Sequence, residues 1–115
     1  MAESFLYLTT TGRKTGLPRR IEIWFVERAG RHYIVSERRE DSGWVKNLTQ
    51  DPRVSFSVGP RDAPASVVPT TAARARIVDG AHEPELAAAV RSLMDEKYRW
   101  SDGSIVELDP AACVP

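Results

Sequence analysis

The sequence predicts an α+β domain of mostly antiparallel strands that close, or partly close, into a barrel. Three observations support this fold class. Short runs rich in aromatic and β-branched residues recur along the chain, with turn signals between them. Only two segments have helical spacing, and one of them is short. Many short strands also leave exposed edges unless the sheet closes, which favours a barrel.

The expected strands of the first third of the chain form hairpins. Residues 5–11 and 21–26 are both strand-like, and a turn rich in glycine and basic residues separates them. Residues 31–36 form a further strand after the Ala29-Gly30 turn. Because so short a connection joins them, the strands on either side of that turn should be antiparallel neighbours.

The rest of the chain adds both helices and the remaining strands. Apolar residues at helical spacing predict a short helix over residues 44–48 that ends before Pro52, and a longer one from Pro84 to near Trp100. Pro69 should occupy an edge or a bulge, because it cannot donate a ladder hydrogen bond. Apolar and β-branched runs predict the other strands, at residues 54–58, 66–68, 72–78 and 105–108.

Length and composition restrict the class of protein. A chain of 115 residues should form one domain, here residues 1–115. Sixteen basic and sixteen acidic residues give a formal net charge of zero, so the whole molecule has no general attraction for nucleic acid or an anionic membrane. The single cysteine, Cys113, and the lack of a secretory or membrane-spanning segment predict a soluble cytoplasmic protein. His32 and His82 have no metal-ligand spacing, so we expect no metal.

The turn at residues 12–16 is the first candidate site. Glycine at positions 12 and 16 permits positive φ angles, at which backbone N–H groups can converge on one anion. Arg13 and Lys14 add charge-assisted hydrogen bonds, so a phosphate would suit this turn. The spacing does not match a nucleotide-binding Walker loop, and a strand rather than a helix follows. The alternative interpretation is a solvated hairpin loop whose charges serve solubility.

A second candidate site follows the strand at residues 31–36. Ser36, Arg38 and Arg39 enter a loop that leads to the short helix, whose N-terminal N–H groups would also favour an anion. Arg38 and Arg39 alternatively pair with neighbouring acidic residues at the surface. Trp44 has the spacing of a core residue in the same helix.

Five segments in this order, TTTGRKTG, PRRIEIWFV, YIVS, WVKNL and DPRVSFSV, resemble the deazaflavin-dependent nitroreductase and quinone reductase family. The resemblance covers nearly the whole chain. It implies a split β-barrel flavin-binding fold, similar to that of pyridoxamine phosphate oxidases, and the deazaflavin coenzyme F420 as hydride carrier. It also implies a homodimer with a second barrel beside the ring.

The resemblance implies a role for each motif. The basic turn would contact the phosphate and acidic tail of the coenzyme, with help from the facing loop, through Gly12, Arg13, Lys14, Thr15, Ser36, Arg38 and Arg39. The next strand would line the ring pocket through Ile21, Glu22, Ile23 and Trp24, whose alternative role is ordinary barrel wall. The short helix would steady the loop or touch the coenzyme through Trp44 and Asn47.

The implied activity is hydride transfer to a quinone-like, nitroaromatic or other conjugated small-molecule acceptor. Tyr33 or Tyr98 would be the candidate proton donors, although each also suits a packing role and solvent could supply the proton. Two alternatives stay open from the residues alone. One is an FMN-binding split barrel, and the other is a non-enzymatic barrel that binds anions or nucleic acid.

Overall fold

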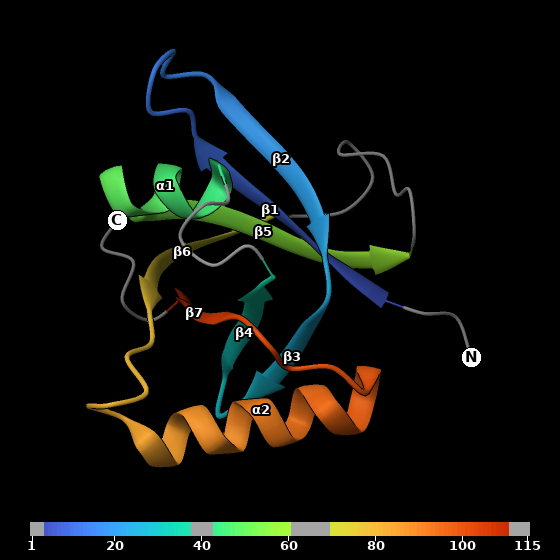
Figure 1. The fold of residues 1–115 in the computed structure, drawn as a ribbon. Coiled ribbons are helices and arrows are strands. Elements are labelled where there is room, and N and C mark those ends of the chain that lie inside the picture. Colours follow the sequence, from blue (N-terminus) through green and yellow to red (C-terminus); the bar gives the residue numbers. More distant parts are fainter. Residues whose placement is uncertain (1–3, 38–42, 61–69, 111–115) are drawn as a thin grey trace.

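The computed structural model describes residues 4–37, 43–60 and 70–110. Seven strands form one sheet in which every pair is antiparallel, and two helices accompany it (Figure 1). The predicted fold class is therefore confirmed. In chain order the elements are β1 (Ser4–Thr11), β2 (Pro18–Ile23), β3 (Phe25–Arg28), β4 (Arg31–Ser36), α1 (Gly43–Gln50), β5 (Arg53–Pro60), β6 (Thr71–Ile77), α2 (Pro84–Tyr98) and β7 (Ser104–Asp109).

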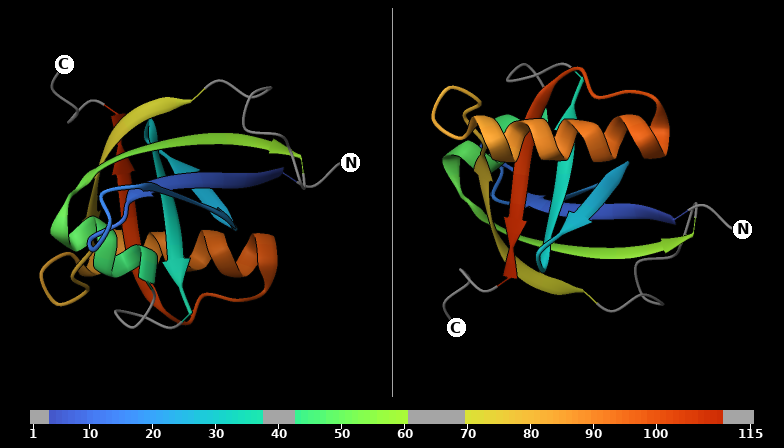
Figure 2. Two further views of the ribbon diagram at one scale, coloured as in Figure 1. Left: turned by 90° about the horizontal axis from the view of Figure 1, so that it is seen from above. Right: turned by 90° about the horizontal axis from the view of Figure 1, so that it is seen from below.

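The sheet curls until its two edges meet at Trp24. Its strand order is β2-β1-β5-β6-β7-β4-β3, so β2 and β3 lie at opposite edges although only Trp24 separates them in the chain. A single residue can join the two edges only where they come together, which makes the sheet a partly closed barrel (Figures 1 and 2). The prediction of one continuous strand over residues 21–26 was wrong, because the chain changes edge at Trp24.

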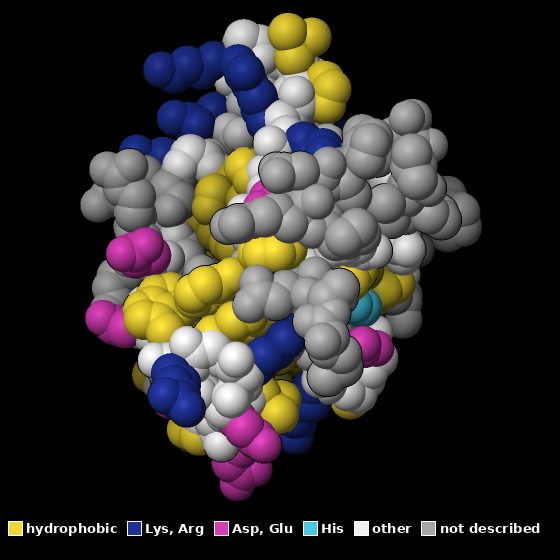
Figure 3. Space-filling view, turned by 90° about the vertical axis from the view of Figure 1, so that its right-hand side faces the viewer, with side chains coloured by type: hydrophobic (Ala, Val, Ile, Leu, Met, Phe, Trp, Pro, Cys, Tyr) yellow, Lys and Arg dark blue, Asp and Glu magenta, His cyan; other side chains and the backbone are white. Residues whose placement is uncertain are grey.

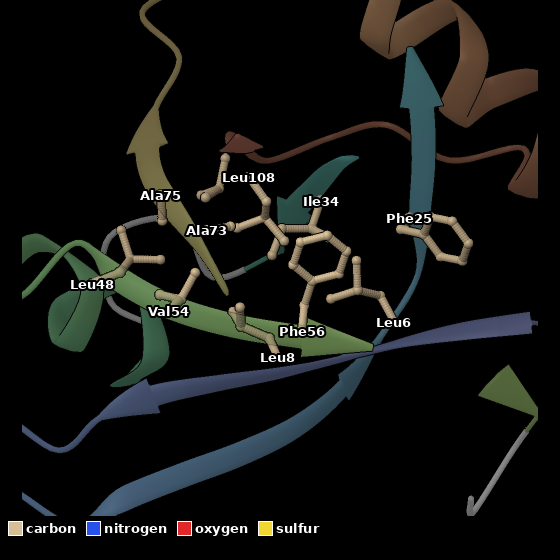
Figure 4. Packing of buried hydrophobic residues seen from close by; sticks show 11 residues of the cluster. Leu6, Leu8, Phe25, Ile34, Leu48, Val54, Phe56, Ala73, Ala75 and Leu108 are labelled. Carbon is tan, nitrogen blue, oxygen red and sulfur yellow. The ribbon is translucent and has the colours of Figure 1, made fainter. Parts of the chain in front are cut away.

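The main core lies inside the curled sheet. Alternate residues of β1 and β5 point inward, among them Leu6, Leu8 and Phe56, and all three are buried (Figure 4). Leu48 of α1 packs into the same cluster and covers one opening of the barrel. This arrangement explains why the short helix keeps apolar residues at helical spacing.

A second core lies between the sheet and α2. Tyr33, Val35 and Ile105 lie on the face of β4 and β7 opposite the main core, where they pack with Val90 and Met94 of α2. Strand β4 is therefore buried on both faces over residues 33–36. Figure 2 shows α2 lying across these strands from the outside.

The boundaries of the other elements follow the sequence predictions closely. Helix α1 ends at Gln50, before Pro52, and α2 begins at Pro84, although α2 ends at Tyr98, short of Trp100. Strand β5 is longer than the predicted 54–58, and the predicted strand at residues 66–68, with Pro69, lies outside the described residues. In the described part of the chain, neither helix is long and apolar enough to cross a bilayer.

Candidate functional site

A basic pocket of about 310 Å³ lies between the β1–β2 turn and the start of α1. It forms because the antiparallel pairing of β1 with β2, in register from Leu6 opposite Ile23 to Thr11 opposite Pro18, projects the turn beyond the sheet and over α1. Its lining residues are Gly12, Arg13, Lys14, Thr15, Arg19, Ile21, Gly43, Trp44 and Asn47.

Hydrogen bonds inside the turn fix its shape. The Gly12 N–H donates to the Leu17 carbonyl at 2.8 Å, and the Gly16 N–H donates to the Gly12 carbonyl at 2.8 Å. These two N–H groups are therefore not the anion donors that the sequence suggested. Only Gly16 has a positive φ, +71°, whereas Gly12 is needed because a Cβ there would lie 3.0 Å from the Leu17 carbonyl oxygen and from Thr15 Oγ1.

Asn47 ties the turn to α1. Its Oδ1 accepts hydrogen bonds from the Arg13 backbone N–H at 3.2 Å and from Arg13 Nη1 at 3.0 Å. Its Nδ2 donates to Thr10 Oγ1 at 3.2 Å, and both Asn47 and Thr10 are buried. The N–H groups of Lys14 and Thr15 have no partner among the described residues, so they remain as backbone donors at the pocket wall.

The cations of this pocket lack acidic partners within the described part of the chain. Arg13, Lys14 and Arg19 all line it, and no described carboxylate forms an ion pair with any of them. By contrast, Arg53 pairs with Asp51, and Arg76 with Glu83 and Glu107. Figure 3 shows Lys and Arg side chains gathered at the end of the molecule formed by the β1–β2 turn. Three such cations beside free N–H groups suit a phosphate or carboxylate group.

A wider pocket of about 680 Å³ adjoins the basic one and shares Trp44 with it. Its wall is largely aromatic and apolar, and the lining residues are Phe5, Glu22, Ile23, Trp24, Val35, Ser36, Glu37, Trp44 and Trp100. Elements β1, β2, β4 and α1 contribute to it, together with the residues that follow β2, β4 and α2. A volume of this size accommodates a small organic ligand.

The end of α2 holds Trp24 in this wall. The Tyr98 ring stacks on the Trp24 indole, with centroids 4.5 Å apart and planes 2° apart. The Tyr98 hydroxyl accepts from the Phe25 N–H at 3.2 Å and donates to the Phe25 carbonyl at 3.0 Å. Lys97 Nζ donates to the same carbonyl at 2.9 Å. Two successive residues of α2 thus fix the point at which the chain changes edge.

The structure places neither candidate proton donor with its hydroxyl at the wider pocket. Tyr33 is 1% exposed, lines neither pocket, and donates to Glu107 Oε2 at 2.9 Å. Burial, reinforced by that hydrogen bond, raises the pKa of Tyr33, so the hydroxyl holds its proton more firmly. Tyr98 engages the Phe25 backbone through its hydroxyl. Both hydroxyl groups are therefore engaged with groups of the protein itself.

Every other described residue that the sequence suggested for coenzyme binding lines one of the two pockets. Arg38 and Arg39 lie outside the described residues. Sequence reasoning missed Phe5, Val35 and Trp100 of the wider pocket. The pairing of β1 with β2 and of β4 with β7 could indicate the first two, but nothing local indicates that Trp100 returns to Trp24.

The described residues contain no group of three or more His, Cys, Asp or Glu side chains that could hold a metal ion.

Solved structures with the same fold are diverse. An F420-H2-dependent reductase, FDR-A, is 23% identical with a TM-score of 0.55, and the match covers 91% of this chain and 93% of that one. HutZ, a heme storage protein from Vibrio cholerae, is 20% identical with a TM-score of 0.72, covering 92% and 80%. A structure described as a domain-swapped dimer is 21% identical with a TM-score of 0.58, covering 95% and 82%. These matches establish the fold.

The family is identified by sequence. No protein with a curated description matches this chain at a significant level. The model of the F420H(2)-dependent quinone reductase family, however, matches residues 1–99, which include the basic turn, the strand change at Trp24 and both helices as far as the end of α2. The prediction of F420 as coenzyme is therefore confirmed over FMN. The chain belongs to the F420H(2)-dependent quinone reductase family and is an F420-dependent oxidoreductase.

Proposed function

We propose that this oxidoreductase reduces a quinone-like, nitroaromatic or other conjugated small molecule, in the cytoplasm, as a homodimer. The observation that carries this proposal is the joining of two chemically different pockets at Trp44. One pocket presents three cations with no acidic partner among the described residues, and the other has aromatic walls. A ligand with an anionic arm and a flat ring fits this pair.

The basic pocket would anchor the phosphate and acidic tail. Lys14 and Arg19 can donate charge-assisted hydrogen bonds, and the N–H groups of Lys14 and Thr15 add neutral donors. Arg13 keeps its position through Asn47 and the Gly43 carbonyl, which its Nη1 reaches at 3.4 Å. The described donors therefore fit an anion, and a larger residue at Gly12 would crowd the turn that carries them.

The wider pocket would orient the reacting rings. When bound, reduced F420 supplies a hydride to the acceptor. The residues of this chain would hold the two rings in a fixed orientation, which would convert a bimolecular encounter into an oriented one. Trp44 marks the passage between the pockets, and Trp24 and Trp100 wall the far end. Neither Tyr33 nor Tyr98 lines the wider pocket, so solvent would supply the proton.

Three exposed apolar side chains motivate the proposed second subunit. Trp24 and Val58 are 41% and 36% exposed, and Leu17 is 59% exposed. We propose that a second copy of this chain covers them. Analytical ultracentrifugation of the protein with and without F420 tests this part of the proposal, and a monomer under both conditions would contradict it.

The decisive experiment is a fluorescence titration of the purified protein with F420 and, separately, with FMN. Lys14→Ala and Arg19→Ala should each weaken F420 binding about tenfold or more, because each removes a charge-assisted contact. Arg74→Ala is the matched control, since Arg74 is an exposed arginine on β6 that lines neither pocket. Tight FMN binding without an F420 response would contradict the assignment of F420 as coenzyme. Unchanged F420 affinity in both pocket variants would refute the anion site.

A further inference from the structure

We propose that Arg91 is a positioning residue for the hydride acceptor, because it holds the turn after α2 in the shape that keeps Trp100 beside Trp24 in the wider pocket. This turn comprises residues 99–103. The effect on the acceptor rests on the function proposed above. The placement of Trp100 does not, since it can be measured on this chain without coenzyme or acceptor.

The chain reverses direction within this turn. Helix α2 ends at Tyr98, and Arg99 follows in the left-handed conformation, with φ +58° and ψ +34°. The Arg99 N–H donates to the Asp95 carbonyl at 2.8 Å. Figure 1 shows the chain turning back from the end of α2 into β7. A residue other than glycine adopts the left-handed conformation at a cost, so contacts elsewhere must hold the turn.

Arg91 supplies two of these contacts. It lies on α2 about two helical turns before the end of the helix. Its Nη1 donates to the Ser101 carbonyl, and its Nη2 donates to the Gly103 carbonyl at 3.0 Å. The planar guanidinium presents its N–H groups in a fixed fork, which the ammonium of a lysine on its flexible stem cannot reproduce. Arg91 lines neither pocket, so it acts on a ligand there through the residues that it holds in place.

Both ends of the turn are fixed by other contacts. A Cβ at Gly103 would lie 2.2 Å from the Ser36 carbonyl oxygen, so the turn meets β4 as closely as glycine allows. At the start of the turn, the Tyr98 hydroxyl holds the Phe25 backbone through two hydrogen bonds. The two bonds from Arg91 therefore set the path of the residues between these ends.

Trp100 is the residue of this turn that lines the wider pocket. Its ring stands at 68° to the Trp24 indole, with 6.4 Å between the centroids, and it packs on the second core. Because Trp100 immediately precedes Ser101, loss of the bonds from Arg91 would free the backbone beside the residue that carries this ring. The far wall of the pocket thus depends on a side chain that lies outside the pocket.

Circular dichroism measures the placement of Trp100 on the protein alone. Two indoles this close couple their excited states, and the resulting signal depends on their distance and angle. The difference between the spectra of the wild type and Trp100→Phe defines the Trp100 signal. Arg91→Met keeps an apolar stem but removes both donors, so it should lose most of this signal. Arg74→Met is the matched control, because it makes the same change at an exposed arginine that lines neither pocket, and it should keep the full signal.

Arg91→Lys tests the requirement for the guanidinium fork. It keeps the charge and can donate to one of the two carbonyls, so its Trp100 signal should lie between those of the wild type and Arg91→Met. This variant also keeps the test available if Arg91→Met does not fold, and urea unfolding identifies the folded variants. A full wild-type signal in either variant would overturn the inference.

Steady-state reduction of menadione, a small quinone, by reduced F420 tests the effect on the acceptor. Arg91→Met should raise the KM for menadione about fivefold and leave kcat and F420 affinity within about twofold of the wild type, because only the wall of the wider pocket has changed. General destabilisation predicts no such division between the two ligands. An unchanged KM, or an equal loss of F420 affinity, would refute the positioning role.

The two proposals can fail separately. If the wild type does not reduce menadione but Arg91→Met loses the Trp100 signal, the proposed quinone reduction fails and the placement of Trp100 by Arg91 stands. If the wild type reduces menadione but the signal persists in Arg91→Met, this inference alone fails.

Discussion

Asn47 is the side chain on which the basic pocket depends most directly. It is 6% exposed and receives two hydrogen bonds from Arg13 while donating one to Thr10. Asn47→Ala removes all three bonds at once, although the helix itself tolerates alanine well. The turn would then lose its connection to α1, and Arg13 would lose the acceptor that holds its guanidinium in the pocket wall.

The cost can be estimated from burial. Thr10 is 2% exposed, so its hydroxyl would lose its partner where water does not reach it easily, a penalty of about 1–3 kcal/mol. Arg13 is exposed and can bond to water instead, so its two contacts add only about 0.5 kcal/mol each. Asn47→Ala should therefore lower the free energy of unfolding by about 2–4 kcal/mol, with an accompanying loss of F420 affinity.

Asn47→Asp separates anchoring from charge. The carboxylate keeps the size of the amide and still accepts both bonds from Arg13, and the Thr10 hydroxyl can rotate to donate to it. The free energy of unfolding should fall by less than about 1 kcal/mol. The new negative charge, however, compensates Arg13 inside the pocket, so F420 should bind about tenfold more weakly.

Urea unfolding followed by circular dichroism, together with F420 fluorescence titration, measures both effects. Gln50→Ala is the matched control, because it removes an exposed amide from the same helix and should change neither quantity. A loss below about 0.5 kcal/mol for Asn47→Ala would show that the three hydrogen bonds contribute little. Wild-type F420 affinity in Asn47→Asp would refute the electrostatic account of the pocket.

Three further predictions concern the barrel. Gly103→Ala should lower the free energy of unfolding by at least ~2 kcal/mol in urea, because a Cβ there would lie 2.2 Å from the Ser36 carbonyl oxygen; wild-type stability would contradict this. Ala29→Asn should raise it by about 0.5–1 kcal/mol, since Ala29 has φ +53° in a hairpin turn that favours asparagine; no gain would argue against strain at that turn. Burial lowers the pKa of His32 below 6.5 in the folded protein. The unfolded chain therefore takes up this proton at a higher pH than the folded chain, and the free energy of unfolding should decrease as the pH drops below about 6.5. Urea midpoints at pH 7 and pH 5 should show a smaller fall in His32→Leu than in wild type or in the control His82→Gln, and an equal fall in all three would exclude His32 as the cause.

Local patterns were sufficient to predict most of the fold. Alternating apolar residues predicted the hairpins, and Pro52 and Pro84 marked the limits of the two helices. The basic turn could likewise be recognised as a site, because its glycines and cations are contiguous in the sequence. Its internal hydrogen bonds could not be predicted, since Leu17 accepts from Gly12 only in the folded turn.

Contacts between distant residues account for what sequence reasoning missed. Residues 21–26 look like one strand, yet Tyr98 takes both backbone groups of Phe25 across a separation of 73 residues. The sequence likewise does not indicate that the Tyr33 hydroxyl donates to Glu107, 74 residues away. In both cases, the deciding partner lies on an element whose position depends on the completed barrel.

This division between local and distant contacts has a consequence for function. The basic pocket is built by the β1–β2 turn and α1, which are held together by Arg13 and Asn47 across 34 residues, less than half the separation between Phe25 and Tyr98. The far end of the wider pocket instead depends on Trp24 and on the end of α2. Substitutions at Tyr98 or Trp100 can therefore reshape the wall of the wider pocket while leaving the basic pocket intact. A fold arranged in this way can keep one coenzyme and change its substrates.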